Sequence, residues 1–241
     1  MMHAQAACLA RSGPQTVALV ELYTSEGCSS CPPADRWLSG IAERYSPRQV
    51  VPLALHVDYW DYIGWKDPYA KREFSQRQRR LSQLQRLALV YTPQVLLQGA
   101  DFRPWDSAEF DHAVARINGQ PARASLELEI LEVRSDAMAL RASAGVSGPV
   151  SRTDAALYVA AYEKGLESRI TAGENRGRVL RHDYVVLEWL GPYTLGTRQF
   201  ELALLPKAKS ADSGVVAFVQ NRRTGEVLQA LWLGACTPGG L

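Results

Sequence analysis

Hydrophobic positions in the first half of the chain predict alternating strands and helices. Apolar runs over residues 17–23 and 50–57 predict two buried strands, and a third such run follows Tyr91. Apolar residues recur at helical spacing over residues 34–45, after the Asp67-Pro68 pair, and from a capping box at residues 106–109 to Asn118. The helix after Asp67-Pro68 carries several arginines, Arg77 among them, which we expect on a solvated face. Residues 16–120 therefore predict an α/β domain.

The pattern changes after residue 120 to the period of two that is typical of strands. Strands are predicted near residues 126–132, 137–143, 154–163, 179–189, 194–205, 214–220 and 226–233, with a hairpin loop at residues 221–225 joining the last two. Short strands without helices are typical of a β-sandwich, so we expect a mainly antiparallel, β-sandwich-like domain over residues 121–241. Residues 1–15 are expected to form an N-terminal tail. The one histidine of the second domain, His182, is expected at the surface or hydrogen-bonded.

Cys28 and Cys31 stand between the first predicted strand and the helix that follows it. A thiolate is the reactive form of cysteine, and the free N–H groups at a helix N-terminus stabilise its negative charge. The two-residue spacer lets the second sulfur resolve a mixed disulfide made by the first. The pattern therefore predicts a thiol–disulfide redox site with both sulfur atoms close together and reachable from solvent.

Two other interpretations of this pair stay open, a structural bridge and a metal site. The chain has four cysteines, and Cys8 and Cys236 lie near its opposite ends, so a zinc site with four thiolates is not expected. His56 ends the second predicted strand. It is either a hydrogen-bonded core histidine or a third ligand that, with Cys28 and Cys31, suits Cu(I).

Residues 58–69 hold five aromatic residues and three aspartates directly after the second predicted strand. Ligand-binding loops in open α/β sheets lie at this end of a strand. One interpretation makes Trp60 and Trp65 walls of an active-site pocket, with Asp58 or Asp61 transferring protons. The other is an aromatic cluster that fixes the loop, with the aspartates capping turns.

Thr92-Pro93 opens the third apolar run and is a further segment with candidate chemistry. A cis bond here would turn the backbone towards the cysteines, where it would accept a substrate strand. Only about 5–6% of such bonds are cis in folded proteins, so base rates alone favour trans.

Composition limits the classes of partner. A net charge of +2 gives no basis for nucleic-acid binding, and the chain has no apolar run of membrane-spanning length. A bridge between Cys8 and Cys236 would close nearly the whole chain and would need an oxidising compartment; the alternative is two free thiols. The Ala4-Gln5-Ala6 segment has the form of a signal-peptidase site. We therefore expect a periplasmic or secreted protein, with a chance alanine cluster as the alternative.

Four ordered segments together resemble one bacterial family. They are residues 21–35 (Glu-Leu-Tyr-Thr-Ser-Glu-Gly-Cys-Ser-Ser-Cys-Pro-Pro-Ala-Asp), 56–61 (His-Val-Asp-Tyr-Trp-Asp), 64–68 (Gly-Trp-Lys-Asp-Pro) and 91–94 (Tyr-Thr-Pro-Gln). The family is the exported thioredoxin-like group called domain of unknown function 1223. The resemblance implies a thioredoxin-like core with Cys28 as nucleophile, Cys31 as resolving thiol and Pro93 as the cis-proline facing them. It implies no substrate.

Thioredoxins also bury an acid behind the cysteines as a proton relay. Glu21, seven residues before Cys28 in an apolar strand, is the candidate, and an edge-strand glutamate facing water is the alternative. The leading hypothesis is a thiol–disulfide oxidoreductase that needs no cofactor. Glu21 or Asp58 would manage protons, and the loop at Thr92 would dock a thiol- or disulfide-bearing protein partner. The rivals are a soft-metal binding protein and a non-catalytic binding module.

Overall fold

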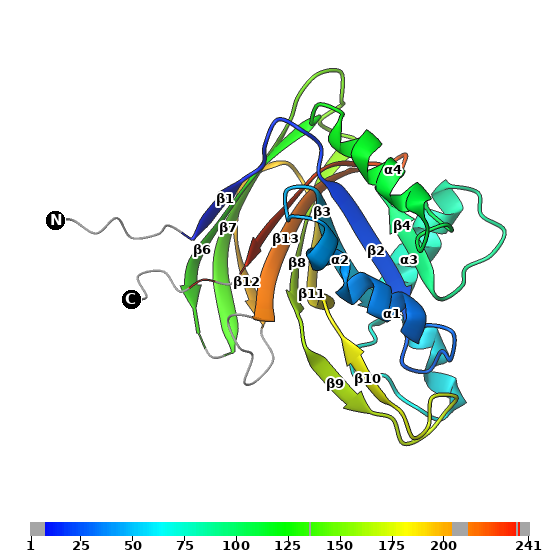
Figure 1. Ribbon diagram of the computed structural model, residues 1–241. Helices are drawn as coiled ribbons and strands as arrows, with labels where there is room; N and C mark the ends of the chain where they lie inside the picture. Colours follow the sequence, from blue (N-terminus) through cyan, green and yellow to red (C-terminus); the bar gives the residue numbers. More distant parts are fainter. Residues whose placement is uncertain (1–7, 135, 204–211, 235, 237–241) are drawn as a thin grey trace.

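The computed structural model describes residues 8–134, 136–203, 212–234 and 236. Strands hold more of these residues than helices do, and the few helices gather around one end of a large mixed sheet (Figure 1). The signal-like segment at Ala4–Ala6 is outside the described residues. Leu9–Arg11, inside the predicted tail, forms strand β1 and pairs with the second half of the chain.

The larger sheet combines strands from both halves of the chain. Its order is β14 (Val227–Gly234), β13 (Ser213–Asn221), β8 (Ala155–Glu163), β11 (Val185–Tyr193), β3 (Val50–His56), β2 (Ala18–Thr24), β4 (Gln94–Leu97) and β5 (Ala100–Asp101). The pairs β2–β3 and β3–β11 are parallel, and the other pairs are antiparallel. The strands predicted after residue 120 are thus divided between this sheet and a second one.

The second sheet has the order β1, β6 (Ala124–Val133), β7 (Ala137–Val146) and β12 (Gly196–Ala203). It packs against β8, β13 and β14, so the two sheets enclose an apolar core. Alternation along β8 explains how one strand serves two cores. Leu157 and Val159 face the second sheet, whereas Tyr158 and Ala160 belong to the core shared with β2 and β3.

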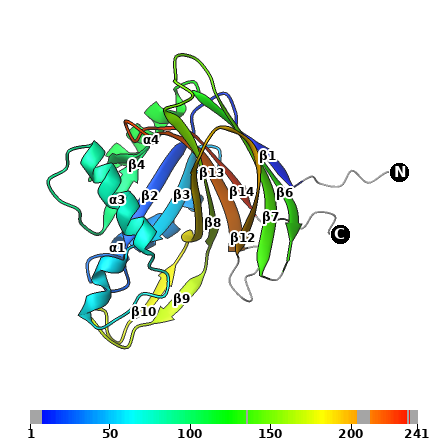
Figure 2. The same cartoon turned by 180° about the vertical axis from the view of Figure 1, so that it is seen from behind.

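Four α-helices in the described residues flank the β2–β4 part of the larger sheet. Helices α1 (Pro32–Ser39) and α4 (Ala108–Asn118) lie on one face, where Trp37 packs against Phe110 with ring centroids 5.0 Å apart. Helix α3 (Arg72–Leu84) lies on the opposite face (Figures 1 and 2). The short helix α2 (Ile41–Arg44) follows α1 as a separate helix. The single helix predicted over residues 34–45 is therefore interrupted at Gly40.

Two predictions about α3 were wrong. The helix begins at Arg72 and not, as expected, directly at Asp67-Pro68. The Asp67 side chain is instead buried and bonds to other segments of the chain. Arg77 does not face solvent. Its side chain is only 8% exposed and pairs with Glu21 of β2 while stacking on the Trp189 ring of β11, 4.6 Å from its centroid. Arg77 therefore connects strands from both halves of the chain.

Two strands form an arm outside both sheets. β9 (Leu166–Arg169) and β10 (Val179–His182) pair antiparallel, and the loop between them extends towards the N-terminal end of α1 (Figure 1). We call residues 170–178 the arm loop. This loop is the part of the second half that reaches the predicted redox pair.

Cys8 and Cys236 form a disulfide, with Cα atoms 5.8 Å apart, that joins the chain before β1 to the chain after β14. The bridge closes a loop of nearly the whole chain and so restricts the unfolded state more than the folded one. Replacing both residues by alanine is expected to lower the free energy of unfolding by about 2–4 kcal/mol. Urea unfolding without reductant measures the loss. An unchanged midpoint would show that the bridge adds no stability.

Candidate functional site

Cys28 and Cys31 are joined by a disulfide at the start of α1, with Cα atoms 5.5 Å apart. Strand β2 ends at Thr24, the chain turns through residues 25–30, and Cys31 is the N-cap of the helix. Its carbonyl accepts the first helical hydrogen bonds, from Ala34 and Asp35. Pro32 and Pro33 occupy the first turn, where no internal partner is needed for a backbone N–H. The predicted order of strand, turn and helix around the pair is confirmed.

The sulfur atoms are not reachable from solvent in this state, contrary to the expectation. Both cysteines have 0% exposed surface. The surface nevertheless begins directly beside them, since Ser29 and Ser30 between the pair are exposed and the Ser30 hydroxyl lies 3.4 Å from Cys28 Sγ. The disulfide therefore lies beneath a thin cover of neighbouring residues.

Part of this cover is the arm loop. Asn175 is fully buried and donates its amide hydrogens to the carbonyls of Glu26 (2.8 Å) and Cys28 (3.0 Å). The backbone N–H of Ser29 donates to the Glu174 carboxylate at 3.1 Å. These bonds hold the turn from both ends. The second half of the chain therefore contributes directly to the candidate site, although its sequence indicated little chemistry.

The predicted aromatic and proline residues lie around the same turn. The Thr92–Pro93 bond is cis, and Trp60 Nε1 donates to the Thr92 hydroxyl at 2.7 Å. Trp60 also packs against Gly27, where a Cβ would lie 3.1 Å from that of Trp60. This close approach explains why glycine, and not a larger residue, precedes Cys28. Trp60 thus connects the cysteine turn with the loop before β4.

Trp65 contacts the turn from another direction. Its indole Nε1 donates to the carboxylate of Glu26 at 2.8 Å. Asp58 and Asp61 point elsewhere: Asp58 accepts from Ser75 of α3, and Asp61 accepts from the backbone N–H of Asp67 at 3.2 Å. The two tryptophans therefore lie at the cysteine turn, while both aspartates fix the 3₁₀ helix Asp58–Ile63 and the loop after it.

Glu21 is fully buried but forms an ion pair. Its oxygens accept from Arg77 Nε at 2.6 Å and Nη2 at 3.1 Å. β2 lies between β3 and β4, so the alternative of a water-facing edge glutamate is wrong. With both oxygens bound to a guanidinium, Glu21 has a structural partner, and its role as a proton relay stays a prediction.

A buried polar cluster that sequence reasoning did not assemble lies beneath the cysteine turn. Its members, each at most 6% exposed, are Glu26, Asp35, His56, Asp67 and His182. His56 Nδ1 lies 2.7 Å from Asp67 Oδ2, and His182 Nε2 lies 3.1 Å from Glu26 Oε1. The two imidazole rings meet edge to face, with centroids 4.9 Å apart. The cluster connects β3, β10 and α1 with the turn before α1, which holds Glu26, and with the loop that holds Asp67.

The cluster changes the protonation of its members. Burial disfavours the charged form of His56, but the neighbouring Asp67, with weaker help from Asp35 and Glu26, outweighs it and raises the pKa of the imidazole. Burial opposes ionisation of Asp67 too, yet His56 and two backbone N–H groups lower its pKa. Both shifts favour the imidazolium form of His56 and the carboxylate form of Asp67.

Stability is expected to depend on pH through His56. A raised folded-state pKa means that its contribution is present below the ordinary histidine value, about 6.5, and is lost as pH rises through the folded value. The gap in unfolding free energy between the wild type and His56→Gln should therefore shrink from pH 5.5 to pH 9. Urea titrations across this range measure the gap. A gap that stays constant would contradict the ion pair.

No group of three or more His, Cys, Asp or Glu side chains within the described ranges is arranged to hold a metal ion. Cys28 and Cys31 are bonded to each other, and His56 bonds to Asp67. The three residues of the soft-metal alternative therefore form no ligand set in this oxidised state. In the same ranges, no helix has the length and hydrophobicity that crossing a bilayer requires.

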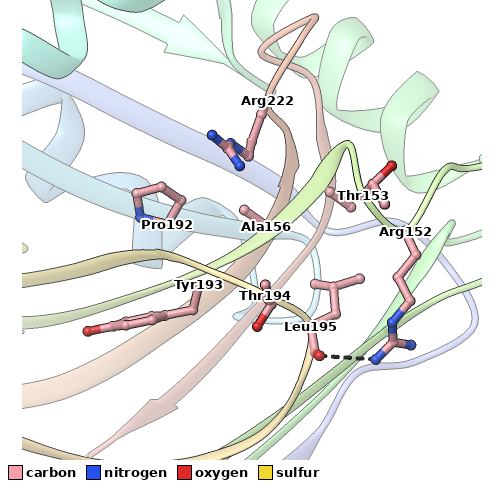
Figure 3. A pocket seen from close by; sticks show the side chains of 9 residues that line it. Arg152, Thr153, Ala156, Pro192, Tyr193, Thr194, Leu195 and Arg222 are labelled. Atoms are coloured by element: carbon pink, nitrogen blue, oxygen red, sulfur yellow. Dashed lines mark hydrogen bonds between the residues drawn. The ribbon is translucent and has the colours of Figure 1, made fainter.

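Two surface hollows lie outside the polar cluster. One is lined by Leu89, Tyr91, Arg103 and Trp105, next to Thr92. The other lies at the ends of β8 and β11, where Arg152 donates to the Leu195 carbonyl at 3.0 Å (Figure 3). The cysteines line neither hollow. Tyr91 of the first hollow is, however, the neighbour in sequence of Thr92, which bonds to Trp60 at the cysteine turn.

Comparison with solved structures shows the fold. The chain is similar to protein AGR_C_4864 of Agrobacterium tumefaciens, with 23% identity over 93% of this chain and 97% of the other and a TM-score of 0.66. It is also similar to HBP35 of Porphyromonas gingivalis, with 15% identity over 95% of this chain and 79% of the other and a TM-score of 0.68. None of the curated proteins matches significantly.

A protein family covers most of the sequence. The family described as "Protein of unknown function (DUF1223)" matches residues 19–220, which include the cysteine turn, the Thr92-Pro93 segment and the arm loop. The match spans strands of both sheets. It agrees with the four segments that pointed to this group in the sequence. The chain therefore belongs to the DUF1223 family.

Proposed function

We propose that the protein is a thiol–disulfide oxidoreductase of the bacterial envelope, built on a thioredoxin-like arrangement of β2, β3, β4, α1, α3 and α4. The observation that carries the proposal is the Cys28–Cys31 disulfide at the N-terminus of a helix that follows a central strand. Free N–H groups and the helix dipole stabilise a thiolate at such a position. The Ser30 hydroxyl beside Cys28 Sγ supports this residue as the leading sulfur.

The chemistry is a two-step exchange. A partner thiolate attacks Cys28, the Cys28–Cys31 bond breaks, and Cys31 leaves as a thiolate that takes up a proton. A second partner thiolate then attacks the partner's sulfur in the mixed disulfide, so that Cys28 leaves and the partner is oxidised to a disulfide. The reverse sequence reduces a partner disulfide and re-forms the Cys28–Cys31 bond. No cofactor is required, since both electrons move between sulfur atoms.

Exposed apolar side chains near Thr92 support docking of a protein partner at this loop. Leu89 is 73% exposed and Val90 is 37% exposed, and Leu89 lines the hollow beside Tyr91. Two disulfides in one chain fit the oxidising conditions of the periplasm or the exterior. The second candidate function is a binding module with an inert bridge. The complete burial of both cysteines favours it.

A redox titration separates the two functions. The Cys8→Ala/Cys236→Ala variant, in which Cys28 and Cys31 are the remaining cysteines, is equilibrated in glutathione or dithiothreitol buffers and its free thiols are counted after alkylation. An exchanging pair should show one two-electron transition with a potential above about −300 mV. A pair that stays oxidised well below this value would overturn the proposed function and favour the inert bridge.

A further inference from the structure

Asp35 stands one helical turn from Cys31, on the same side of α1. Cys31 is the N-cap, and residues four apart on a helix face the same way. The backbone N–H of Asp35 donates to the Cys31 carbonyl at 3.1 Å, which fixes this register. The Asp35 side chain is only 6% exposed. A carboxyl group in this position needs a reason, because burying it is costly.

The Asp35 carboxyl group has one close hydrogen-bond partner and one more distant imidazole neighbour. Its Oδ1 accepts from the Thr24 hydroxyl at 2.8 Å, and its Oδ2 lies 3.9 Å from His182 Nδ1, a buried nitrogen without a hydrogen-bond partner. The other two carboxylates of the cluster each have an imidazole nitrogen within 3.1 Å. Asp35 is therefore the carboxyl group of this cluster that has no imidazole nitrogen within hydrogen-bond distance.

We propose that Asp35 accepts the proton of the Cys31 thiol when the disulfide re-forms and returns it when the disulfide opens, with Thr24 and His182 positioning its carboxyl group. This inference rests on the proposed function. The Cys31 thiolate attacks Cys28 Sγ of a mixed disulfide, the Cys28–Cys31 bond forms, and the partner sulfur leaves with the electron pair. Asp35 then holds the proton, which it passes to the leaving thiolate or to solvent.

The electrostatics of the cluster agree with this role. Burial raises the pKa of Asp35, while His182, His56 and the Thr24 hydroxyl act against the rise and Asp67 adds to it. A raised carboxyl pKa lies closer to that of a thiol, and proton transfer is most efficient when the two values approach each other. Glu26, bonded to His182, is the remaining charged group facing the cluster from the turn before α1.

The test isolates the resolution step. In the Cys8→Ala/Cys236→Ala background, the reduced protein reacts with an aromatic disulfide reagent that releases one coloured thiolate on attack by Cys28 and a second on resolution by Cys31. Asp35→Asn is expected to slow the second release about tenfold to a hundredfold near pH 7, with little change in the first. Asp111→Asn, on the exposed face of α4, serves as the matched control and should resolve at the background rate.

A second variant separates proton transfer from a structural role. Thr24→Val removes a hydrogen bond that favours ionised Asp35, so the pH profile of resolution should shift to higher pH with its maximum rate kept. Wild-type rates and pH profile in Asp35→Asn, or an unshifted profile in Thr24→Val, would overturn the inference. The reagent assay needs no protein partner, so it tests the role of Asp35 separately from the proposed function. Absence of turnover with any protein partner would refute the proposed function instead.

Discussion

Turnover of a disulfide substrate should fall to the background rate in Cys28→Ser. Cys28 is the leading sulfur of the proposed exchange, and a serine hydroxyl forms no mixed disulfide. Insulin reduction in the presence of dithiothreitol, or oxidation of a model dithiol peptide, measures the loss. The oxygen of serine nearly preserves the shape of the buried turn, so the variant should fold.

Two further variants make this result specific. Cys31→Ser should accumulate a mixed disulfide between Cys28 and the substrate, visible as an added mass that reductant removes. Cys8→Ala/Cys236→Ala should keep turnover, because that bridge lies against the second core, away from the cysteine turn. Equal rates in Cys28→Ser and the wild type would rule out the enzyme.

Arg77→Met is expected to lower the free energy of unfolding by about 3–5 kcal/mol, the usual loss when one partner of a buried ion pair is removed. Glu21 is fully buried, and without Arg77 its carboxylate would have no cation beside it. The substitution also removes the guanidinium that stacks on Trp189 and lies 5.2 Å from the centroid of the Tyr158 ring. Urea unfolding at pH 7 measures the loss.

The double variant Glu21→Leu/Arg77→Met serves as the control. Two apolar side chains in place of a buried ion pair are often neutral, so most of the lost stability should return. Recovery would show that the loss comes from an unpaired charge. A double variant as unstable as Arg77→Met would instead assign the loss to packing. Its redox activity also tests Glu21: full activity in the refolded double variant would exclude this residue as the proton relay.

The sequence predicted local elements better than their assembly. The period-two pattern located β6, β7, β8, β13 and β14, and the strand before Cys28 was placed correctly. Strand periodicity does not, however, specify a neighbouring strand. Val185 of β11 pairs in parallel with Ala54 of β3, and no local signal marks a contact between residues 131 positions apart. The strand order of the eight-stranded sheet could therefore not be predicted from the sequence.

The candidate site divides in the same way. Cys28, Cys31, Trp60 and Thr92 were found because their types and spacing are distinctive. His182 was expected at the surface or hydrogen-bonded, and the hydrogen-bonded alternative is confirmed, but its place beneath the cysteine turn was not foreseen. Asn175 was missed, since an asparagine in a glycine-rich loop is ordinary in a β-rich region. A helix was expected to begin at Asp67-Pro68, because an Asp-Pro pair usually marks a helix start. Its burial beside His56 depends on tertiary packing.

Strand β10 and the arm loop connect the second half of the chain to the cysteine turn of the first half. A fragment ending at residue 120 would keep both cysteines, yet it would lose the imidazole that bonds to Glu26 and the amide that supports the Cys28 carbonyl. It would also leave one side of β3 without β11. Recombination at this point, in evolution or in the laboratory, would transfer the cysteine pair without the groups that hold it in place.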